Sequence, residues 1–480
     1  MRKIVCCVLC AGILLPLTAA VGCSSPRKRD GYVMNLEYFP EERKLTAEAT
    51  LTLSNRTDTE LGELKFQLWA NAYREGAKYA PVSQLYESKA YYNGKSYGGI
   101  TIASVTGGTF AVTGEDANIL TVKPSSPLYP DEQITLGMQF EVDLAQINHR
   151  LGVGEHNVNL AHFYPIPCFY GQSGYEEYVY TPTGDPFVNE CMDFDVTLTV
   201  PENYTAVYNG TGECVAQNGK KAYHIIAENV RDTAIVLGTE LKSVTATADG
   251  VPVEYYYFSD AAPEASLKAA TESLAYYAKT FGAYTYPRYT VVETDFPYGG
   301  MEYSGMAMIA SDLSSTEIPT VIAHETAHQW WYGMVGSNQY CSSWQDEGLA
   351  EFSTALFFGA HPSYGVTYEN AVAASEKSYR AFFSVYSQIN GEANTKMNRP
   401  LTSFTGDYEY RNIAYDKGVI LFSRLKSVLG EKKFFAGLKR YAEQYRGKLA
   451  TQENMISCFT AAGGNAEGVF TSFTEGLCVI

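Results

Sequence analysis

The amino-acid sequence predicts two folded parts, an N-terminal antiparallel all-β sandwich or saddle domain followed by a mainly helical α+β domain. Residues 42–55, 193–201 and 231–239 alternate apolar and polar side chains with the period of two that is typical of half-buried strands. From about Val251 the apolar residues recur at helical spacing instead. A chain of 480 residues is long enough for two or three domains of this kind.

We place the β domain at residues 33–247 and the helical domain at residues 248–480. Clusters of Gly, Asn, Asp and Pro separate the strand-like segments of the first domain, as turns do. In the second domain, residues 262–282 predict a helix that begins near Pro263 and ends at Gly282. The remaining elements expected there are a short strand at 289–295, helices at 363–388 and 411–430, a polar loop at 391–405, and a short helical C-terminal tail.

Residues 1–22 have the pattern of a secretory signal peptide. Arg2 and Lys3 precede an apolar run, and small residues precede Cys23. A cysteine at this point looks like the lipobox of bacterial lipoproteins, in which Cys23 would carry the lipid and residues 23–32 would form a tether. The alternative is an uncleaved anchor helix, since the run approaches the ~20 residues needed to span a bilayer. Either interpretation places the protein outside the cytoplasm, attached to a bacterial cell membrane.

The charge balance excludes nucleic acid as a partner. Removing residues 1–22 takes away two basic residues and no acidic ones, which changes the net charge from −17 to −19. A body this acidic repels phosphate backbones, and no basic patch interleaved with aromatic residues occurs. Beyond Cys23 no CxxC pair occurs, so a cysteine zinc site is not expected, and disulfide pairing cannot be read from spacing. We interpret His162 as a packed, hydrogen-bonded histidine, not as a ligand.

The strongest chemical signal is a pair of histidines, His324 and His328, in a predicted helix from Thr316 to about Val335. Thr316 as N-cap and Pro319 in the first turn would begin this helix. Residues four apart lie on one helix face, so the two imidazoles can bind one Zn²⁺ together. Glu347, which follows His328 after 18 intervening residues, is the candidate third ligand. Glu325 then stands beside the metal as the candidate general base.

These four residues match the HExxH-(18 residues)-E pattern of the aminopeptidase N family of zinc metallopeptidases (gluzincins), which the chain resembles most closely from Gly299 to Gly418. The resemblance implies a thermolysin-like catalytic domain that binds one zinc ion per chain. It also implies an aminopeptidase whose partners are peptides with a free N-terminus.

The resemblance extends to Gly299-Gly300-Met301-Glu302, which is similar to the family's G-A-M-E-N motif. There the glutamate receives the substrate's amino terminus, and we expect that role for Glu302. Gly300 stands in place of alanine and Tyr303 in place of asparagine. Met301 is expected to form the floor of the first side-chain pocket, or else to fill the core.

Two more residues are assigned by position. Tyr415 matches the family tyrosine that stabilises the oxyanion, with Tyr408 and Tyr410 as alternatives for that role. Glu351, four residues after Glu347, either orients a histidine ligand from outside or is a helix-surface carboxylate.

The sequence therefore predicts a zinc-dependent aminopeptidase that hydrolyses peptides by metal-activated water. A zinc endopeptidase or another hydrolase on the same scaffold is one alternative. A surface-anchored peptide-binding protein with an inactive peptidase fold is the other. The large C-terminal helical domain of the family's longer members has no counterpart here, which predicts a more open cleft.

Overall fold

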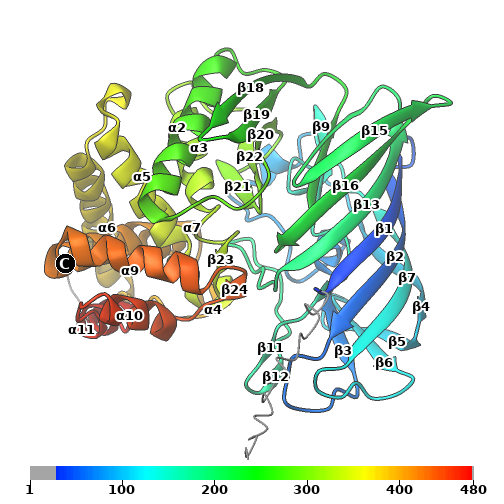
Figure 1. Cartoon of the computed structure of the whole chain (residues 1–480), viewed down its shortest axis with the longest axis horizontal. Coiled ribbons are helices and arrows are strands. Elements are labelled where there is room, and N and C mark those ends of the chain that lie inside the picture. The colour runs from blue at the N-terminus through cyan, green and yellow to red at the C-terminus, as the bar shows by residue number, and fades with distance from the viewer. Residues whose placement is uncertain (1–28, 478–480) are drawn as a thin grey trace, which may run out of the picture.

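The computed structural model describes residues 29–477 of the chain. The expected signal peptide at 1–22, the lipidated Cys23 and most of the tether at 23–32 lie outside the described residues. Two parts face each other: β-sheets of the N-terminal half lie on one side, and the helices of the C-terminal half lie on the other (Figure 1). A five-stranded sheet that belongs to the second part lies between them.

The N-terminal part is built on a seven-stranded sheet in the order β15-β16-β13-β1-β2-β7-β4. These strands are β1 (Gly31–Phe39), β2 (Lys44–Ser54), β4 (Gly99–Thr106), β7 (Gln133–Asp143), β13 (Met192–Pro201), β15 (Thr211–Gln217) and β16 (Lys220–Val230). Buried and half-buried residues alternate along all of β13, as the sequence pattern predicts. The sheet is not wholly antiparallel, because β1 pairs with β13 in parallel from Gly31 to Glu37.

Smaller sheets pack beside this large one. A first sheet has the order β10-β3-β6-β5, a second the order β14-β17-β9-β8, and β11 pairs only with β12. Their bounds are β3 (Leu64–Gln67), β5 (Gly108–Thr113), β6 (Ile119–Pro124), β8 (Leu151–Val153), β9 (Asn157–Ala161), β10 (Ile166–Pro167), β11 (Tyr170–Gly171), β12 (Gly174–Tyr175), β14 (Thr205–Tyr208) and β17 (Ala234–Gly238). A short helix, α1 (Glu87–Ala90), lies in the connection that leads to β4.

The sheet of the second part has the order β18-β19-β20-β22-β21, which leaves β21 at its edge. The strands are β18 (Lys242–Ala248), β19 (Val251–Tyr257), β20 (Tyr289–Thr294), β21 (Gly300–Tyr303) and β22 (Met306–Ala310). β19, β20 and β22 run parallel, whereas β18 and β21 are antiparallel to their neighbours. The hairpin β18–β19 spans the limit we placed between residues 247 and 248.

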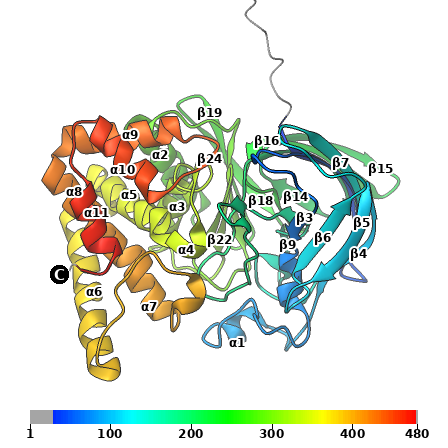
Figure 2. The same cartoon turned by 90° about the horizontal axis from the view of Figure 1, so that it is seen from below.

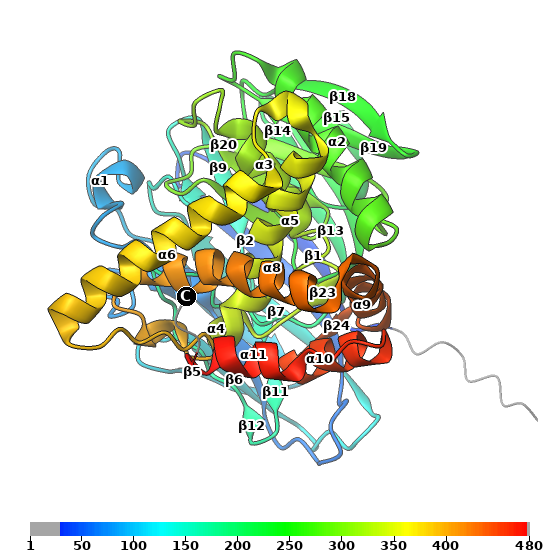
Figure 3. The same ribbon diagram turned by 90° about the vertical axis from the view of Figure 1, so that its left-hand side faces the viewer.

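Helices cover this sheet and continue to the C-terminal end. They are α2 (Pro263–Phe281), α3 (Ile318–Ala327), α4 (Gln339–Ser342), α5 (Glu347–Ala360), α6 (Tyr368–Asn390), α7 (Asp407–Arg411), α8 (Lys417–Leu429), α9 (Glu431–Gln444), α10 (Gln452–Ala461) and α11 (Glu467–Thr474). The long α6 crosses over α5 and α8 (Figure 3). A two-residue pairing of β23 (Val335–Gly336) with β24 (Lys448–Leu449) ties the tail to the segment after α3.

Two helices differ from the sequence expectation. α3 begins at Ile318 with Glu317 at its N-cap, because the Glu317 carboxylate already accepts hydrogen bonds from Ser314 and closes a turn before the helix. The predicted helix at 411–430 is interrupted by a π-helical turn at Asn412–Asp416, which contains Tyr415.

The C-terminal end of α3 also differs from the prediction, which placed it at about Val335. After His328 the backbone widens, and Gly333 N donates to His328 O at 2.9 Å instead of continuing the α-helical pattern.

Among the described residues, no group forms a hydrogen bond with either ring nitrogen of His162, which corrects our interpretation of this histidine as hydrogen-bonded. Its ring is buried and stacks on Phe187 at 3.7 Å between centroids.

A buried arginine joins the two parts. Arg231, which follows β16, donates from Nε to Tyr332 O at 2.5 Å and from Nη2 to Lys448 O at 2.7 Å. Its third bond runs from Nη1 to Asn189 O at 2.9 Å. Because these carbonyls belong to both parts, the arginine fixes the segment after α3 against the β domain.

Two further properties concern the whole of the described chain. Within residues 29–477 the cysteines are all unpaired. No helix in that range combines the length and the hydropathy needed to cross a bilayer.

Candidate metal centre

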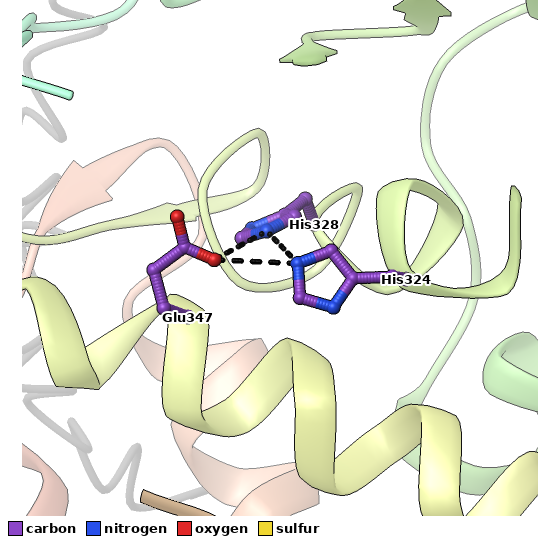
Figure 4. Close-up of side chains that lie close together, drawn as sticks. All are labelled: His324, His328 and Glu347. Atoms are coloured by element: carbon purple, nitrogen blue, oxygen red, sulfur yellow. Dashed lines mark hydrogen bonds and ion pairs between the residues drawn. The ribbon is translucent and has the colours of Figure 1, made fainter. Parts of the chain in front are cut away.

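Three side chains from two helices converge on one point (Figure 4). The Nε2 atoms of His324 and His328 lie 3.1 Å apart, and Glu347 Oε2 lies 3.3 Å from each of them. Ligands bound tetrahedrally at 2.0–2.1 Å stand roughly 3.3 Å from one another. The spacing of these donors therefore fits a Zn²⁺ ion, and two imidazoles with one carboxylate are a donor set that leaves one position open.

Local chain geometry brings the ligands together. His324 lies in the last turn of α3 and His328 caps its end, one turn further on. Glu347 is the first residue of α5, where the Asp346 carboxylate accepts a hydrogen bond from Glu347 N at 2.8 Å. The ligand carboxylate thus begins a helix that packs on α3.

The outer nitrogens of both imidazoles are also fixed. His324 Nδ1 donates to Glu351 Oε2 at 2.9 Å, and His328 Nδ1 donates to Trp331 O at 3.0 Å. These bonds leave Nε2 of each ring as the lone-pair atom that faces the ligand site. Of the two roles we weighed for Glu351, the structure shows the one that orients a histidine.

The imidazoles and carboxylates of the site stabilise each other's charges. Burial lowers the pKa of His324, but the carboxylates of Glu347 and Glu351 outweigh it and raise that pKa to about 10. Burial raises the pKa of Glu347, but His328 and His324 outweigh it and hold the pKa well below its usual range. Each group is thus stabilised in its charged form by the opposite charge beside it, as a cation would stabilise the carboxylates.

Glu325 lies next to the ligands with an unused oxygen. Its Oε2 is buried and has no hydrogen-bond partner among the described residues. Burial raises the pKa of its carboxyl to about 7, against the lowering effect of His324 and His328. Gly300 makes room for it, since a Cβ built on Gly300 would lie 2.5 Å from Glu325 Oε1. A carboxylate that titrates near neutral pH suits general-base chemistry.

Glu302 stands on the edge strand β21 and is buried. Gln339 Nε2 donates to Glu302 Oε1 at 3.2 Å, and burial raises the pKa of Glu302 well above its usual range. The carboxylate lies on the same side as the metal ligands. One oxygen of Glu302, one carboxylate oxygen of Glu325 and one ring nitrogen of His328 all lie within 4.8 Å of one another. Burying such a group without a full partner costs free energy that a bound ammonium would recover.

Tyr415 projects from the π-helical turn and stacks on His324, with 5.7 Å between ring centroids and 11° between planes. Tyr410 contacts the Tyr415 ring at 5.8 Å, one step further from the ligands. Tyr408 is half exposed and packs on Phe382, away from the ligands. Of the three tyrosines considered, only Tyr415 contacts a ligand ring.

The close approach of Tyr415 to the ligands depends on two glycines. A Cβ on Gly348 of α5 would lie 2.9 Å from the Cα of Gly418 on α8. No side chain fits between these helices, so α8 and the turn before it pack directly against α5.

A cavity of ≈ 280 Å³ opens beside β21 and Tyr415. Gly300 and Met301, for which the sequence predicts a role in substrate binding, line it, and so do residues that sequence reasoning missed. Among these are Arg411 and an ion pair between Arg150 and Asp185. Single charges far apart in the sequence carry no signal of a common site, because only the fold brings them to the cavity.

Comparison with known proteins finds similarity to peptidases. Residues 265–473 match the model of the peptidase family M1 domain. Among curated proteins, the chain is 26% identical to human endoplasmic reticulum aminopeptidase 2 over 48% of its length, which is 25% of that protein. It is 23% identical to puromycin-sensitive aminopeptidase of Caenorhabditis elegans over 75% of its length, which is 39% of that protein. The chain thus spans between a quarter and two fifths of these relatives.

A solved structure matches over nearly the whole length. The M1 zinc metallopeptidase from Deinococcus radiodurans superposes with a TM-score of 0.65 at 18% identity, covering 94% of this chain and 95% of that one. At this identity the match establishes the fold alone: two domains, the first mostly β and the second mainly helical.

Proposed function

We propose that this chain is a zinc-dependent aminopeptidase of peptidase family M1, whose domain model matches residues 265–473. The observation that carries the proposal is the meeting of His324, His328 and Glu347 beside the edge strand that bears Glu302. One side of the site would hold the metal, and the other would hold the amino terminus of a peptide.

The substrate would lie along β21. An edge strand has unpaired backbone groups, so an extended peptide can pair with it. The Glu302 carboxylate would bind the peptide's α-ammonium and fix its register. One residue at a time would then be released, because only the first peptide bond reaches the metal ligands.

Zn²⁺ bound by the three ligands would act as a Lewis acid and supply an acidified water at neutral pH. Glu325 would accept a proton from the attacking water and return it to the leaving amine. Tyr415 would donate its phenolic O–H to the carbonyl oxygen as negative charge develops there. Glu351 would keep His324 in the tautomer that binds metal.

The two alternative functions that the sequence left open would use these residues differently. An inactive peptide-binding protein would have no need of Glu325, whose carboxylate is nevertheless aimed at the site with an unused oxygen. An endopeptidase would have no need of a buried carboxylate on the edge strand. Both features favour an aminopeptidase.

The test is an aminoacyl-amide panel with wild type and Glu325→Gln, combined with the zinc content of each protein. We expect Glu325→Gln to keep its zinc and to lose turnover by about 10²–10⁴-fold. Wild-type protein with one zinc per chain and no hydrolysis of any free-amine substrate would exclude the proposal.

We also propose that residues 1–22 direct export and that Cys23 anchors the protein in a bacterial cell membrane. The support is the sequence pattern alone, a basic start, an apolar run and a cysteine after small residues. Metabolic labelling with a radioactive fatty acid tests this. We expect label in the wild type and none in Cys23→Ala, whereas equal labelling of the two would contradict a lipid at Cys23.

A further inference from the structure

The cavity beside β21 is bordered by a contact between the two parts of the chain. Asp407, the first residue of α7, accepts hydrogen bonds from Ser83 Oγ at 2.9 Å and from Thr183 Oγ1 at 2.8 Å. Both hydroxyls belong to the β domain, and α1 and α7 lie along the same edge of the molecule (Figure 2).

Arg411 lines this cavity. Asp407 is four residues earlier on α7 and would be its usual ion-pair partner. Both oxygens of Asp407 are engaged by Ser83 and Thr183 instead. Within residues 29–477, Arg411 forms no ion pair with a carboxylate, and its side chain is exposed. The cavity therefore contains a cationic group available for an anion from a ligand.

The location of Arg411 relative to β21 sets which part of a peptide it would meet. Tyr86 and Tyr298 line the same cavity as Arg411, and their rings contact each other at 4.8 Å between centroids. Tyr298 directly precedes Gly299, so Arg411 lies toward the Gly299 end of the strand. Glu302, which would hold the amine, is at the other end.

The distance along the strand favours short peptides. Three residues of extended chain, from Glu302 back to Gly299, span about 10 Å at 3.3–3.6 Å per residue. A peptide of two or three residues has a similar span between its amine and its terminal carboxylate. With its amine at Glu302, such a peptide would bring its carboxylate to the end of the strand where Arg411 lies.

We propose that Arg411 binds a carboxylate on the leaving portion of the substrate, which makes di- and tripeptides with a free carboxyl terminus the preferred class. This inference rests on the proposed aminopeptidase function. A guanidinium can form two parallel hydrogen bonds with a carboxylate, which adds orientation to the charge attraction. The same chemistry is available from an acidic side chain in the leaving portion, so the two sources are separated by experiment.

The experiment compares Ala-Ala-Ala, its C-terminal amide, and Ala-Ala-Asp amide as substrates of the zinc-loaded wild type. We expect kcat/KM for the free acid to exceed that for the amide by about tenfold, mostly through KM, and the ratio to shrink with added salt. If kcat/KM for Ala-Ala-Asp amide equals that for the free acid, Arg411 binds a carboxylate from either source. If it equals that for the plain amide, Arg411 binds the terminal carboxylate alone.

Variants test whether Arg411 is responsible. We expect Arg411→Gln to bring the acid-to-amide ratio of kcat/KM to within about twofold of one and Arg411→Glu to invert it. Arg424→Gln, which removes an exposed arginine from α8, should keep the wild-type ratio. An acid-to-amide ratio of one in the wild type, or an unchanged ratio in Arg411→Gln, would overturn the inference.

A binding measurement separates failure of this inference from failure of the proposed function. Calorimetric titration of Glu325→Gln protein with the acid and the amide compares affinities without turnover. Tighter binding of the acid that Arg411→Gln removes supports the carboxylate site whatever the rates are. Equal affinities overturn it, while hydrolysis of both peptides would leave the aminopeptidase function standing.

Discussion

Glu325 lies directly against Gly300, in a space that has no room for one more methyl group. A Cβ built on Gly300 would meet Glu325 at 2.5 Å from Oε1 and 2.7 Å from Cγ. The strand that would bind substrate therefore also determines where the candidate general base can lie. In the family that the sequence resembles, alanine stands at this position.

This contact predicts that Gly300→Ala displaces the Glu325 carboxylate and lowers kcat by about 10²-fold, since a misplacement of about 1 Å can cost that much. Zinc content should not change, because the three atoms nearest to a Cβ on Gly300 all belong to Glu325, which is not a ligand. Gly299→Ala is the matched comparison, because a Cβ there would meet only Val321, at 3.5 Å and 3.8 Å. Similar kcat values for the two variants would show that the contact with Glu325 has no influence on turnover.

Glu302→Gln should remove the preference for free amino termini. The change keeps the shape of the side chain but removes the charge that would pair with an α-ammonium, a contact worth about 1.5–3 kcal/mol. We therefore expect kcat/KM for free-amine peptides to fall by roughly 10–100-fold. Rates for the corresponding N-acetylated peptides should change little, and an equal loss on both substrates would argue against the assigned role.

Tyr415→Phe should lower kcat by about 10²–10³-fold with a small change in KM, because an oxyanion donor acts mainly in the transition state. Tyr408→Phe serves as the control, since Tyr408 is half exposed and packs on Phe382 and Tyr386. Steady-state kinetics on one aminoacyl anilide measures both. A loss confined to KM in Tyr415→Phe would instead assign the hydroxyl to substrate binding.

The buried carboxyl of Asp232 lies outside the candidate metal centre. It predicts that the free energy of unfolding depends on pH. Burial raises the pKa of its carboxyl to about 6, although Tyr332 Oη and Ser304 N donate to it. Because the folded pKa exceeds the unfolded value of 3.8, its contribution to stability is full below pH ~4 and is lost as pH rises through about 6. The total loss amounts to about 3 kcal/mol.

The measurement is denaturant unfolding of wild type and Asp232→Asn at several values between pH 4 and pH 7. The wild type should lose stability relative to the variant across that range, since asparagine does not titrate. Other titrating groups are common to both proteins and cancel in the difference. A difference that stays constant with pH would mean that Asp232 keeps an ordinary pKa.

The metal ligands could be predicted from the sequence because their arrangement is mostly local. His324 and His328 are related by one helical turn, and Glu347 follows in the next long helix. Glu302 and Tyr415 needed the family resemblance, since a single glutamate or tyrosine carries no signal of its own. The structure shows that both lie beside the ligands.

Other features depend on contacts between distant parts of the chain. The ion pair of Arg150 with Asp185 and the diversion of Asp407 toward Ser83 and Thr183 arise only when the two domains pack. The end of α3 near His328 and the π-helical turn around Tyr415 reflect packing that overrides helical propensity. Parallel pairing of β1 with β13 joins strands separated by most of the first domain.

The central claim is that His324, His328 and Glu347 bind one zinc ion. Crystals of the purified full chain, measured on both sides of the zinc absorption edge, test it most directly. We predict one anomalous peak per chain, bonded to Nε2 of both histidines and to a carboxylate oxygen of Glu347 at about 2.0–2.2 Å. Zinc-supplied crystals with no peak between these three side chains, or with Glu347 turned away from the metal, would contradict the claim.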